Sequence, residues 1–337
     1  MNEGGLAVKF SRKKMTDFVS EKTKDCRVLV VGDIMLDKYF CGEVSRISPE
    51  APVPITRVVK VKETLGGAAN VAHNLALLGC RTIVAGYIGN DYHGESLRKQ
   101  FMERNISMDG LVETEAPTTT KIRVIGGHQQ MMRLDFEETK PAADENGKRL
   151  LSKVKKCLEA GSQAIILSDY GKGVCTAELC GEIISLGKEY GVPVIVDPKG
   201  TDWGRYRGAD YITPNLKELN EVQKEPAENK DEAVVRAARY AMRRFHIGAM
   251  VATRSECGLS MVRSRSVVHI PTKAQEVFDV SGAGDTVIAT FAMALAGGLD
   301  PASGAYLSNL AAGVVVGKLG TYAVSRDELL NALQTEK

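Results

Sequence analysis

The apolar positions of the chain fall into short continuous runs separated by longer segments of helical length. Cys26–Val31, Ala164–Leu167 and Ala249–Ala252 are almost free of polar residues, as is typical of strands buried on both faces of a parallel sheet. Segments such as Thr176–Tyr190 and Lys230–Phe245 have the length and composition of helices. This alternation predicts an α/β fold with a mostly parallel central sheet covered by helices.

Two regions break the alternation and have the pattern of exposed strands. Residues 38–62 are interrupted by prolines, and Val53–Lys62 alternates partly between apolar and polar positions. Residues 117–136 form the second region, in which Gly126 and Gly127 suit a hairpin turn. We expect the two regions to form a small lid sheet, whose apolar face is covered by ligand, by the body or by another subunit.

The rest of the chain predicts one domain. Residues 25–337 contain no repeat, low-complexity tract or interdomain linker. Residues 1–24 are polar and charged, with no apolar core of a signal peptide. We expect this segment to form an N-terminal arm or a first helix outside the core.

Composition narrows the class of protein. Apolar residues make up 44% and charged residues 26% of the chain, as in a soluble globular protein. The formal net charge is +2 with Lys and Arg spread along the chain, so we expect no nucleic-acid partner. The longest strongly apolar run, Val287–Leu299, is too short for a bilayer. The 7 cysteines are scattered without a C-x-x-C pair, which indicates a cytoplasmic protein with reduced thiols and no structural zinc.

Polar and charged residues follow the predicted strands where each of them ends. Because the carboxyl ends of parallel strands meet at one edge of a sheet, these residues predict a single long site there. Taken alone, any of the acids would be interpreted as a turn or cap residue. The strand-end residues are Asp33, Asp37, Ser168–Gly173, Asp197–Lys199, Asn215–Glu218 and Thr253–Gly258.

One stretch, Asp279–Asp285, places two glycines and an acid where a loop becomes a helix. The first amides of a helix lack internal partners and attract anions such as phosphate. Asp285 is then either a capping acid or a base that takes a proton from an attacking hydroxyl, and the spacing does not decide between these two interpretations. Asn215 and Glu218, three residues apart, suit magnesium-bound waters near nucleotide phosphates. Together these features fit phosphoryl transfer to an alcohol.

Several other motifs are absent from the sequence. There is no Walker A loop, no G-x-G-x-x-G after the first strand, no G-x-S-x-G elbow and no H-E-x-x-H. Their absence argues against a P-loop enzyme and against a dinucleotide-dependent oxidoreductase.

The Asp279–Asp285 stretch resembles the second signature of the ribokinase-like, or PfkB, carbohydrate kinases. The resemblance runs from about residue 26 to the C-terminus and includes the Gly66–Gly67 hinge, the Asn215–Glu218 element and the lid strands. It implies a ribokinase-like three-layer α/β/α sandwich with a small β-sheet lid. Further runs resemble the heptose 7-phosphate kinase branch, namely Val30–Asp37, Ser45–Pro54, Gly66–Ala72, Arg133–Glu137 and Ser168–Gly173.

That branch implies ATP-dependent phosphorylation of D-glycero-β-D-manno-heptose 7-phosphate at O1, giving the 1,7-bisphosphate for ADP-heptose and lipopolysaccharide synthesis. In many bacteria this kinase is fused to a nucleotidyltransferase, and the chain resembles the stand-alone form. Other sugar or nucleoside acceptors, such as fructose 1-phosphate or ribose, remain open. So does a catalytically silent regulator that binds sugar or nucleotide.

The resemblance also implies roles for single residues. Asp285 would be the general base, and the amides of Gly282, Ala283 and Gly284 would stabilise charge on the transferred phosphoryl group. The sugar would be bound by Asp33, Asp37, Gly66, Gly67, Asn70 and Arg133. The nucleotide would lie along Lys199, Asn215, Thr253, Glu256, Gly258 and Asn309. Asn215 and Glu218 would organise Mg²⁺ through water.

Three further expectations follow from the resemblance. Asp279 would hold the signature loop or assist a monovalent cation such as K⁺, and Val280 replaces a hydroxyl residue found in many relatives. The lid predicts a homodimer packed lid on lid. The distal phosphate needs cations, for which Arg46, Arg123, Arg133 and Lys172 are candidates, although each alone would be interpreted as a solvated surface charge.

Overall fold

The computed structural model describes residues 10–127, 129–138, 144–272, 277–318 and 320–335. Within them, nine strands form the sheet of the body, in the order β13-β12-β11-β10-β9-β8-β1-β4-β5. Neighbouring strands from β5 to β11 pair in parallel, whereas β12 and β13 add antiparallel at one edge. The strands are β1 (Arg27–Gly32), β4 (Arg81–Gly89), β5 (Ser107–Thr114), β8 (Ala164–Ser168), β9 (Val194–Asp197), β10 (Tyr211–Ile212), β11 (Ala249–Thr253), β12 (Leu259–Val262) and β13 (Val267–Ile270).

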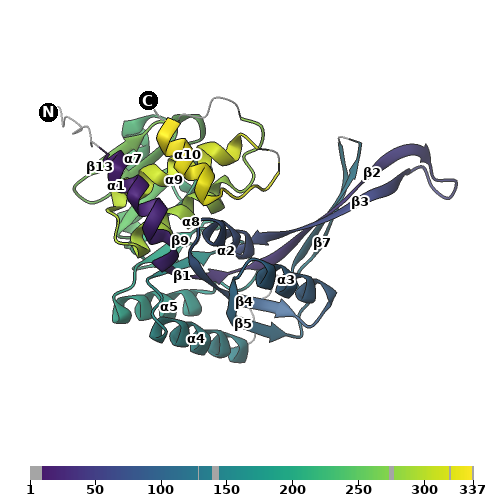
Figure 1. Ribbon diagram of the computed structural model, residues 1–337, viewed down its shortest axis with the longest axis horizontal. Coiled ribbons are helices and arrows are strands. Elements are labelled where there is room, and N and C mark those ends of the chain that lie inside the picture. Colours follow the sequence, from purple (N-terminus) through teal and green to yellow (C-terminus); the bar gives the residue numbers. More distant parts are fainter. Residues whose placement is uncertain (1–9, 128, 139–143, 273–276, 319, 336–337) are drawn as a thin grey trace.

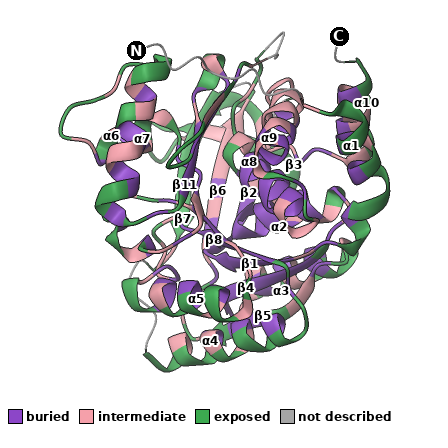
Figure 2. Cartoon of the chain, turned by 90° about the vertical axis from the view of Figure 1, so that its left-hand side faces the viewer, coloured by how far each residue is buried: buried purple, intermediate pink, exposed green. Residues whose placement is uncertain are grey.

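Helices cover both faces of this sheet (Figures 1 and 2). The central strand β1 shows why, because its successive side chains point to opposite faces. Val28 and Val30 pack into one apolar core, and Leu29 and Val31 into the other. The first core lies under α1 (Arg12–Asp17), α2 (Ala68–Leu77), α3 (Tyr92–Glu103), α8 (Ala283–Ala296), α9 (Pro301–Val316) and α10 (Arg326–Thr335). The second lies under α4 (Asp144–Glu159), α5 (Ala177–Tyr190), α6 (Leu216–Glu221) and α7 (Asp231–Phe245). The predicted three-layer α/β/α sandwich is confirmed.

A second sheet forms the lid, in the order β3-β2-β6-β7, and extends away from the body (Figure 1). Its strands are β2 (Ile34–Ile47), β3 (Pro54–Gly67), β6 (Thr120–Gly126) and β7 (Gln129–Phe136). The lid was predicted, but β2 and β3 are longer than residues 38–62. Their inner ends are buried, so they lack the exposed alternation by which the lid was recognised.

The expectation that residues 1–24 lie outside the core is wrong for the part that the structure describes. Met15, Phe18 and Val19 are buried in the first core. Phe18 lies so close to Gly297, at the end of α8, that a Cβ there would approach its ring to 2.2 Å. The apolar residues at i, i+3 and i+4 form one helical face, which the surrounding charges obscure in the sequence.

The edge strand β5 and the terminal helix α10 have only a weak signal in the sequence. Both lie at the margin of the body, and their charged residues weaken the periodic signal. No helix in the described part of the chain is long and apolar enough to cross a membrane.

Candidate active site

Asp285 occupies the first turn of α8, below the carboxyl ends of the central strands. The helix begins after Gly282, whose φ of 82° is a left-handed conformation suited to glycine. The Asp285 side chain is buried, and burial raises its pKa from the ordinary value to about 6. A carboxylate with a pKa near the working pH is well suited to accept a proton from a hydroxyl group.

Two side chains hold the Asp285 carboxylate. The amide Nδ2 of Asn70, in α2, donates to Oδ2 at 2.6 Å, and the Tyr170 hydroxyl donates to Oδ1 at 2.7 Å. Both hydrogen bonds favour the ionised form, so they oppose the rise in the pKa of Asp285 that burial causes. Burial and the nearby Asp285 charge raise the pKa of Tyr170 well above its ordinary value, so its hydroxyl remains a donor.

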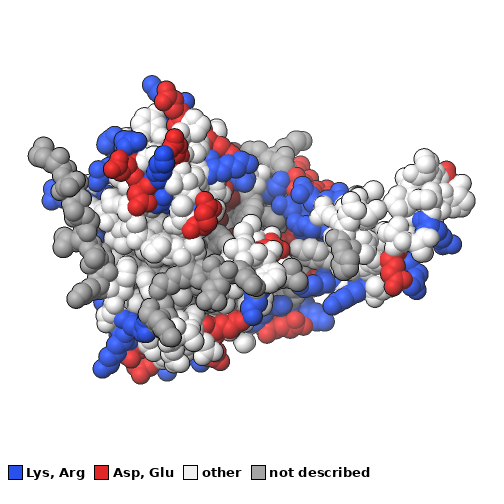
Figure 3. Space-filling view, turned by 90° about the horizontal axis from the view of Figure 1, so that it is seen from above, with Lys and Arg blue, Asp and Glu red and all other residues white. Residues whose placement is uncertain are grey.

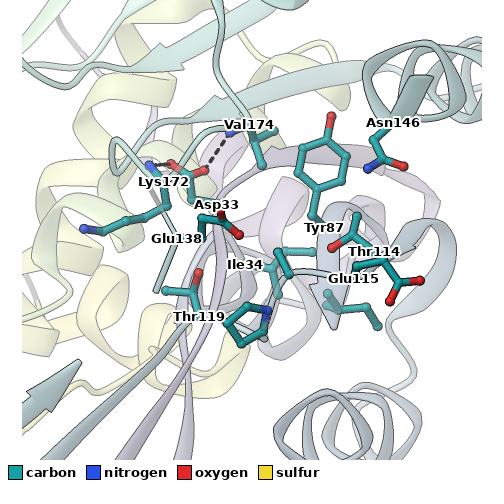
Figure 4. A pocket seen from close by; sticks show the side chains of 13 residues that line it. Asp33, Ile34, Tyr87, Thr114, Glu115, Thr119, Glu138, Asn146, Lys172 and Val174 are labelled. Atoms are coloured by element: carbon teal, nitrogen blue, oxygen red, sulfur yellow. Dashed lines mark hydrogen bonds between the residues drawn. The ribbon is translucent and has the colours of Figure 1, made fainter. Parts of the chain in front are cut away.

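Tyr170 is placed by Asp33, at the end of β1. The Asp33 carboxylate accepts hydrogen bonds from the backbone amides of Tyr170, Lys172 and Val174, at 2.7, 3.0 and 3.1 Å. Figure 4 shows the last two of these beside a cavity of about 440 Å³. Asp33 therefore holds the loop after β8, and through that loop it places the Tyr170 hydroxyl beside Asp285.

The predicted sugar residues at the root of the lid pack tightly. β2 and β3 pair Asp37 with Thr64 and Met35 with Gly66. A Cβ on Gly66 would lie 2.5 Å from the Asp37 carboxylate, which explains the glycine. Asp37 is buried and accepts a hydrogen bond from Arg123 of β6 at 2.5 Å.

Gly67 begins α2 with a φ of 55°, and a Cβ there would meet the Asp33 carbonyl at 2.4 Å. Arg133, also predicted to bind sugar, is exposed and forms two hydrogen bonds with Asp135 of its own strand, both 2.9 Å long. The structure thus brings together all the predicted sugar residues except Arg133.

The signature loop is held by its first acid. Asp279 accepts hydrogen bonds from the amides of Ser281 and Gly320, at 2.9 and 3.0 Å. This geometry matches the loop-holding role foreseen for Asp279. The Ala283 amide donates to the Val280 carbonyl at 3.2 Å, so it serves the turn itself. The Thr286 amide donates to the Gly282 carbonyl at 3.0 Å, so the first-turn amides that remain for an anion are those of Gly284 and Asp285.

Asp285 shares a cavity of about 160 Å³ with the predicted magnesium residues. Asn215 and Glu218 form a capping box, in which each side chain accepts a hydrogen bond from the backbone amide of the other. One Glu218 oxygen, Oε1, lies 4.0 Å from the Lys199 ammonium. Burial raises the pKa of Glu218.

The same cavity contains Asp197, which the sequence had marked only as a strand-end residue. Burial, followed by the charges of Asp285 and Glu218, raises its pKa well above the ordinary value. Among the described residues, no group of three or more His, Cys, Asp or Glu side chains is arranged to hold a metal ion directly. Mg²⁺ commonly keeps several waters and binds through one or two carboxylates and substrate phosphates. Asp197 and Glu218, whose side chains line one cavity with Gly282 and Gly284, fit that pattern.

The predicted nucleotide residues divide into two groups. Lys199, Asn215 and Thr253 line the cavity of Asp285. The other three hold the surrounding loops. Gly258 has a φ of 76° and approaches the Ile270 carbonyl, Glu256 accepts a hydrogen bond from Asn229 at 3.2 Å, and Asn309 donates to the Pro271 carbonyl at 2.9 Å.

Sequence reasoning missed Tyr170 and Asp197 as site residues. Both belong to strand-end runs that had been identified, but no spacing rule selects one member of such a run. Only the folded structure identifies them, because Tyr170 meets Asp285 from 115 positions away in the chain.

Comparisons with known proteins show the family of the chain. A family model described as pfkB family carbohydrate kinase matches residues 26–328. The chain is 45% identical over 307 residues to the Bifunctional protein HldE of Geobacter sulfurreducens, which covers 90% of this chain and 62% of that protein. It is also 45% identical over 312 residues to the protein of that name from Aeromonas salmonicida, covering 92% and 64%. The chain thus spans a little under two thirds of the length of these relatives.

Solved structures match at the level of the fold. Ribokinase from Thermotoga maritima has a TM-score of 0.70 at 22% identity, covering 92% of this chain and 100% of that one. Phosphofructokinase-2 from Escherichia coli, in complex with potassium, has a TM-score of 0.75 at 19% identity, covering 92% and 98%.

Proposed function

The chain belongs to the pfkB family of carbohydrate kinases, and we propose that it transfers the γ-phosphoryl group of ATP to O1 of D-glycero-β-D-manno-heptose 7-phosphate. The product is the 1,7-bisphosphate, a precursor of ADP-heptose for lipopolysaccharide. The observation that carries the reaction type is the buried Asp285, with a pKa of about 6, next to the glycine loop at the start of α8.

In this mechanism Asp285 takes the proton of the acceptor hydroxyl as that oxygen attacks phosphorus. Asn70 and Tyr170 hold the two carboxylate oxygens, so that the base has one orientation. The free amides in the first turn of α8 face the charge that develops on the phosphoryl group. Positioning and electrostatics of this kind account for most of the catalysis of phosphoryl transfer.

ATP is used with a divalent metal in this family, and we infer that Mg²⁺ is held through water by Asn215, Glu218 and Asp197. When bound, Mg²⁺ neutralises charge on the nucleotide phosphates. A monovalent cation such as K⁺ would bind near Asp279. Two measurements test these ions: turnover with and without Mg²⁺, and turnover in K⁺ compared with turnover in Na⁺.

The heptose assignment rests on two supports. One is the resemblance of runs such as Ser45–Pro54 and Ser168–Gly173 to heptose 7-phosphate kinases. The other is the identity of about 45% to proteins named Bifunctional protein HldE. Other acceptors of the family, such as fructose 1-phosphate or ribose, are the alternatives.

An acceptor panel with coupled detection of ADP tests the assignment. We expect turnover with the heptose 7-phosphate at least about a hundredfold more efficient, in kcat/KM, than with ribose, fructose or fructose 1-phosphate. Preference for another sugar would reject the heptose but keep the kinase. ATP binding without turnover of any acceptor would favour a non-catalytic regulator.

We also propose that the protein is a cytoplasmic homodimer in which a second copy covers the lid. Apolar side chains are exposed on the lid strands, among them Val59 at 60% and Met132 at 56%. Figure 3 shows uncharged surface at the far end of the lid between a few charged side chains. Sedimentation should give a dimer for the native chain and a monomer for the double variant Val59→Glu, Met132→Glu. A native monomer would refute the proposal.

A further inference from the structure

The face of the lid that carries Asp37 has an ordered set of charges. In the register of the sheet, Lys121 of β6 lies between Asp37 of β2 and Asp135 of β7. Arg123, two residues further along β6, shares this face because successive strand residues alternate sides. Arg133 of β7 lies directly beside Arg123. Cations and carboxylates therefore meet in neighbouring rows above the acceptor site.

Each carboxylate around Lys121 already has a cationic partner. Arg123 pairs with Asp37 at 2.5 Å, and Arg133 pairs with Asp135 at 2.9 Å. A third pair joins Lys172, after β8, to Glu137 at 2.8 Å. Within the described ranges, no ion pair reaches the Lys121 ammonium, so this group of charges has one positive charge in excess.

The excess charge lies next to the catalytic base. The Lys121 ammonium is 6.0 Å from the centre of the Tyr170 ring, and the hydroxyl of that ring binds Asp285. The Lys121 side chain is half-buried, and it is absent from the lining of the cavity that contains Asn215 and Glu218. Because Lys121 lies beside Asp37, a predicted sugar residue, we assign it to the acceptor side of the site.

We propose that Lys121 binds the phosphate group that the acceptor sugar already carries, and that this contact selects phosphorylated sugars. The inference rests on the proposed function, because it needs an acceptor with a phosphate distant from the reacting hydroxyl. A phosphate would supply the missing counter-charge for a cation that is already partly removed from water. An unphosphorylated sugar would leave that cation without a partner, which disfavours its binding.

Lys121 was not among the cations considered from the sequence, which were Arg46, Arg123, Arg133 and Lys172. Three of these four are occupied by the carboxylates named above. Nothing in the sequence distinguishes an occupied cation from a free one, because pairing depends on the register of three strands.

The test compares Lys121→Met with the native chain by steady-state kinetics. We expect the KM for the heptose 7-phosphate to rise about tenfold to a hundredfold, as for loss of a charged hydrogen bond to phosphate. The KM for ATP should stay within about twofold, because the nucleotide lies elsewhere. The dephosphorylated heptose, measured as a competitive inhibitor, should keep its inhibition constant within about twofold.

Two matched variants control the result. Lys121→Arg keeps the positive charge and should restore most of the affinity for the sugar phosphate. Lys155→Met removes an exposed lysine charge from α4, on the body, and should leave every constant unchanged.

The outcomes distinguish failure of the Lys121 proposal from failure of the proposed kinase function. If the native chain phosphorylates the heptose 7-phosphate and Lys121→Met has an unchanged KM for it, the inference is wrong and the function stands. Equal losses of affinity for the phosphorylated and dephosphorylated sugars would also overturn it, since they would indicate a general disturbance of the lid. If the native chain uses only unphosphorylated sugars, both fail.

Discussion

The buried corner around Asp285 and the face of the lid above it are built differently. Around Asp285, Asn70 and Asp33 are each 2% exposed, and hydrogen bonds of 2.6–2.7 Å join Asn70 and Tyr170 to Asp285 and Tyr170 to Asp33. On the lid, ion pairs join Arg123 to Asp37 across neighbouring strands and Arg133 to Asp135 within β7, and apolar residues such as Val59 face solvent. Buried hydrogen bonds fix one geometry, whereas partly solvated ion pairs exchange partners readily. We therefore expect the chemical step to depend on the buried residues around Asp285 and the choice of acceptor to depend on the lid.

The largest expected effect comes from the corner. Asp285→Asn should lower kcat by about three orders of magnitude while ATP still binds, because it removes the base and leaves the nucleotide contacts. Coupled ADP detection and a nucleotide titration measure the two quantities. Asp327→Asn, an exposed acid of α10, is the control with native turnover. Near-native turnover of Asp285→Asn would contradict its role as base.

A smaller effect is expected for Tyr170→Phe, which removes one donor to the base. We expect kcat to fall about tenfold to a hundredfold at neutral pH. Asp285 must be ionised to act, so kcat/KM should fall as pH drops below its pKa of about 6. Loss of the Tyr170 hydrogen bond removes an influence that lowers this pKa, so the acid limb of the profile should move to higher pH.

Substrate phosphates also titrate in this pH range, but they do so equally for the native chain and for Tyr170→Phe. The difference between the pH profiles of these two proteins therefore reports the ionisation of Asp285. Tyr190→Phe, which removes an exposed hydroxyl at the end of α5 that reaches Glu159, should keep the native profile. An acid limb that does not move for Tyr170→Phe would show that the hydroxyl leaves the base unaffected.

On the lid, Arg123→Met should act mainly on acceptor affinity. It leaves the buried Asp37 without its partner, so the KM for the sugar should rise about tenfold, with kcat reduced no more than about twofold. Saturation curves at fixed ATP separate the two constants. A fall in kcat as large as the rise in KM would break the division between corner and lid.

The smallest expected effect concerns stability. The pKa of Asp285 is about 6 in the folded chain and 3.8 as its ordinary value, so folding favours the protonated form. The stability that this carboxyl contributes is complete below about pH 4 and is lost as pH rises through about 6.

Asp285→Asn keeps a neutral group at every pH. It should therefore unfold with a free energy about 1–2 kcal/mol higher than the native chain at about pH 8, allowing for one weakened hydrogen bond. The two should be equal near pH 4. Urea denaturation at both pH values measures this, and a constant difference between them would contradict the buried charge.

Part of the site could be predicted from sequence because it is local. The glycine loop before α8, the capping pair Asn215 and Glu218, and Gly66 and Gly67 before α2 each show their chemistry within a few residues. Asp33 was recognised as a site residue, but its three amide partners lie about 140 positions away, so its action through the Tyr170 loop was invisible. Lys121 was missed for a related reason, since its lack of a partner depends on strand register.

The class of fold could be predicted from local patterns, and the type of reaction from such patterns together with a family resemblance. Runs of apolar residues specify buried strands, and a glycine loop with an acid specifies a phosphate site, because both depend on neighbours in the chain. Packing of the strands and helices sets how Asp285 is held and which acids share its cavity. It also leaves Lys121 without an ion pair among the residues that the structure describes. Those properties depend on burial and on distances between residues far apart in the chain, which are set only when the strands and helices pack.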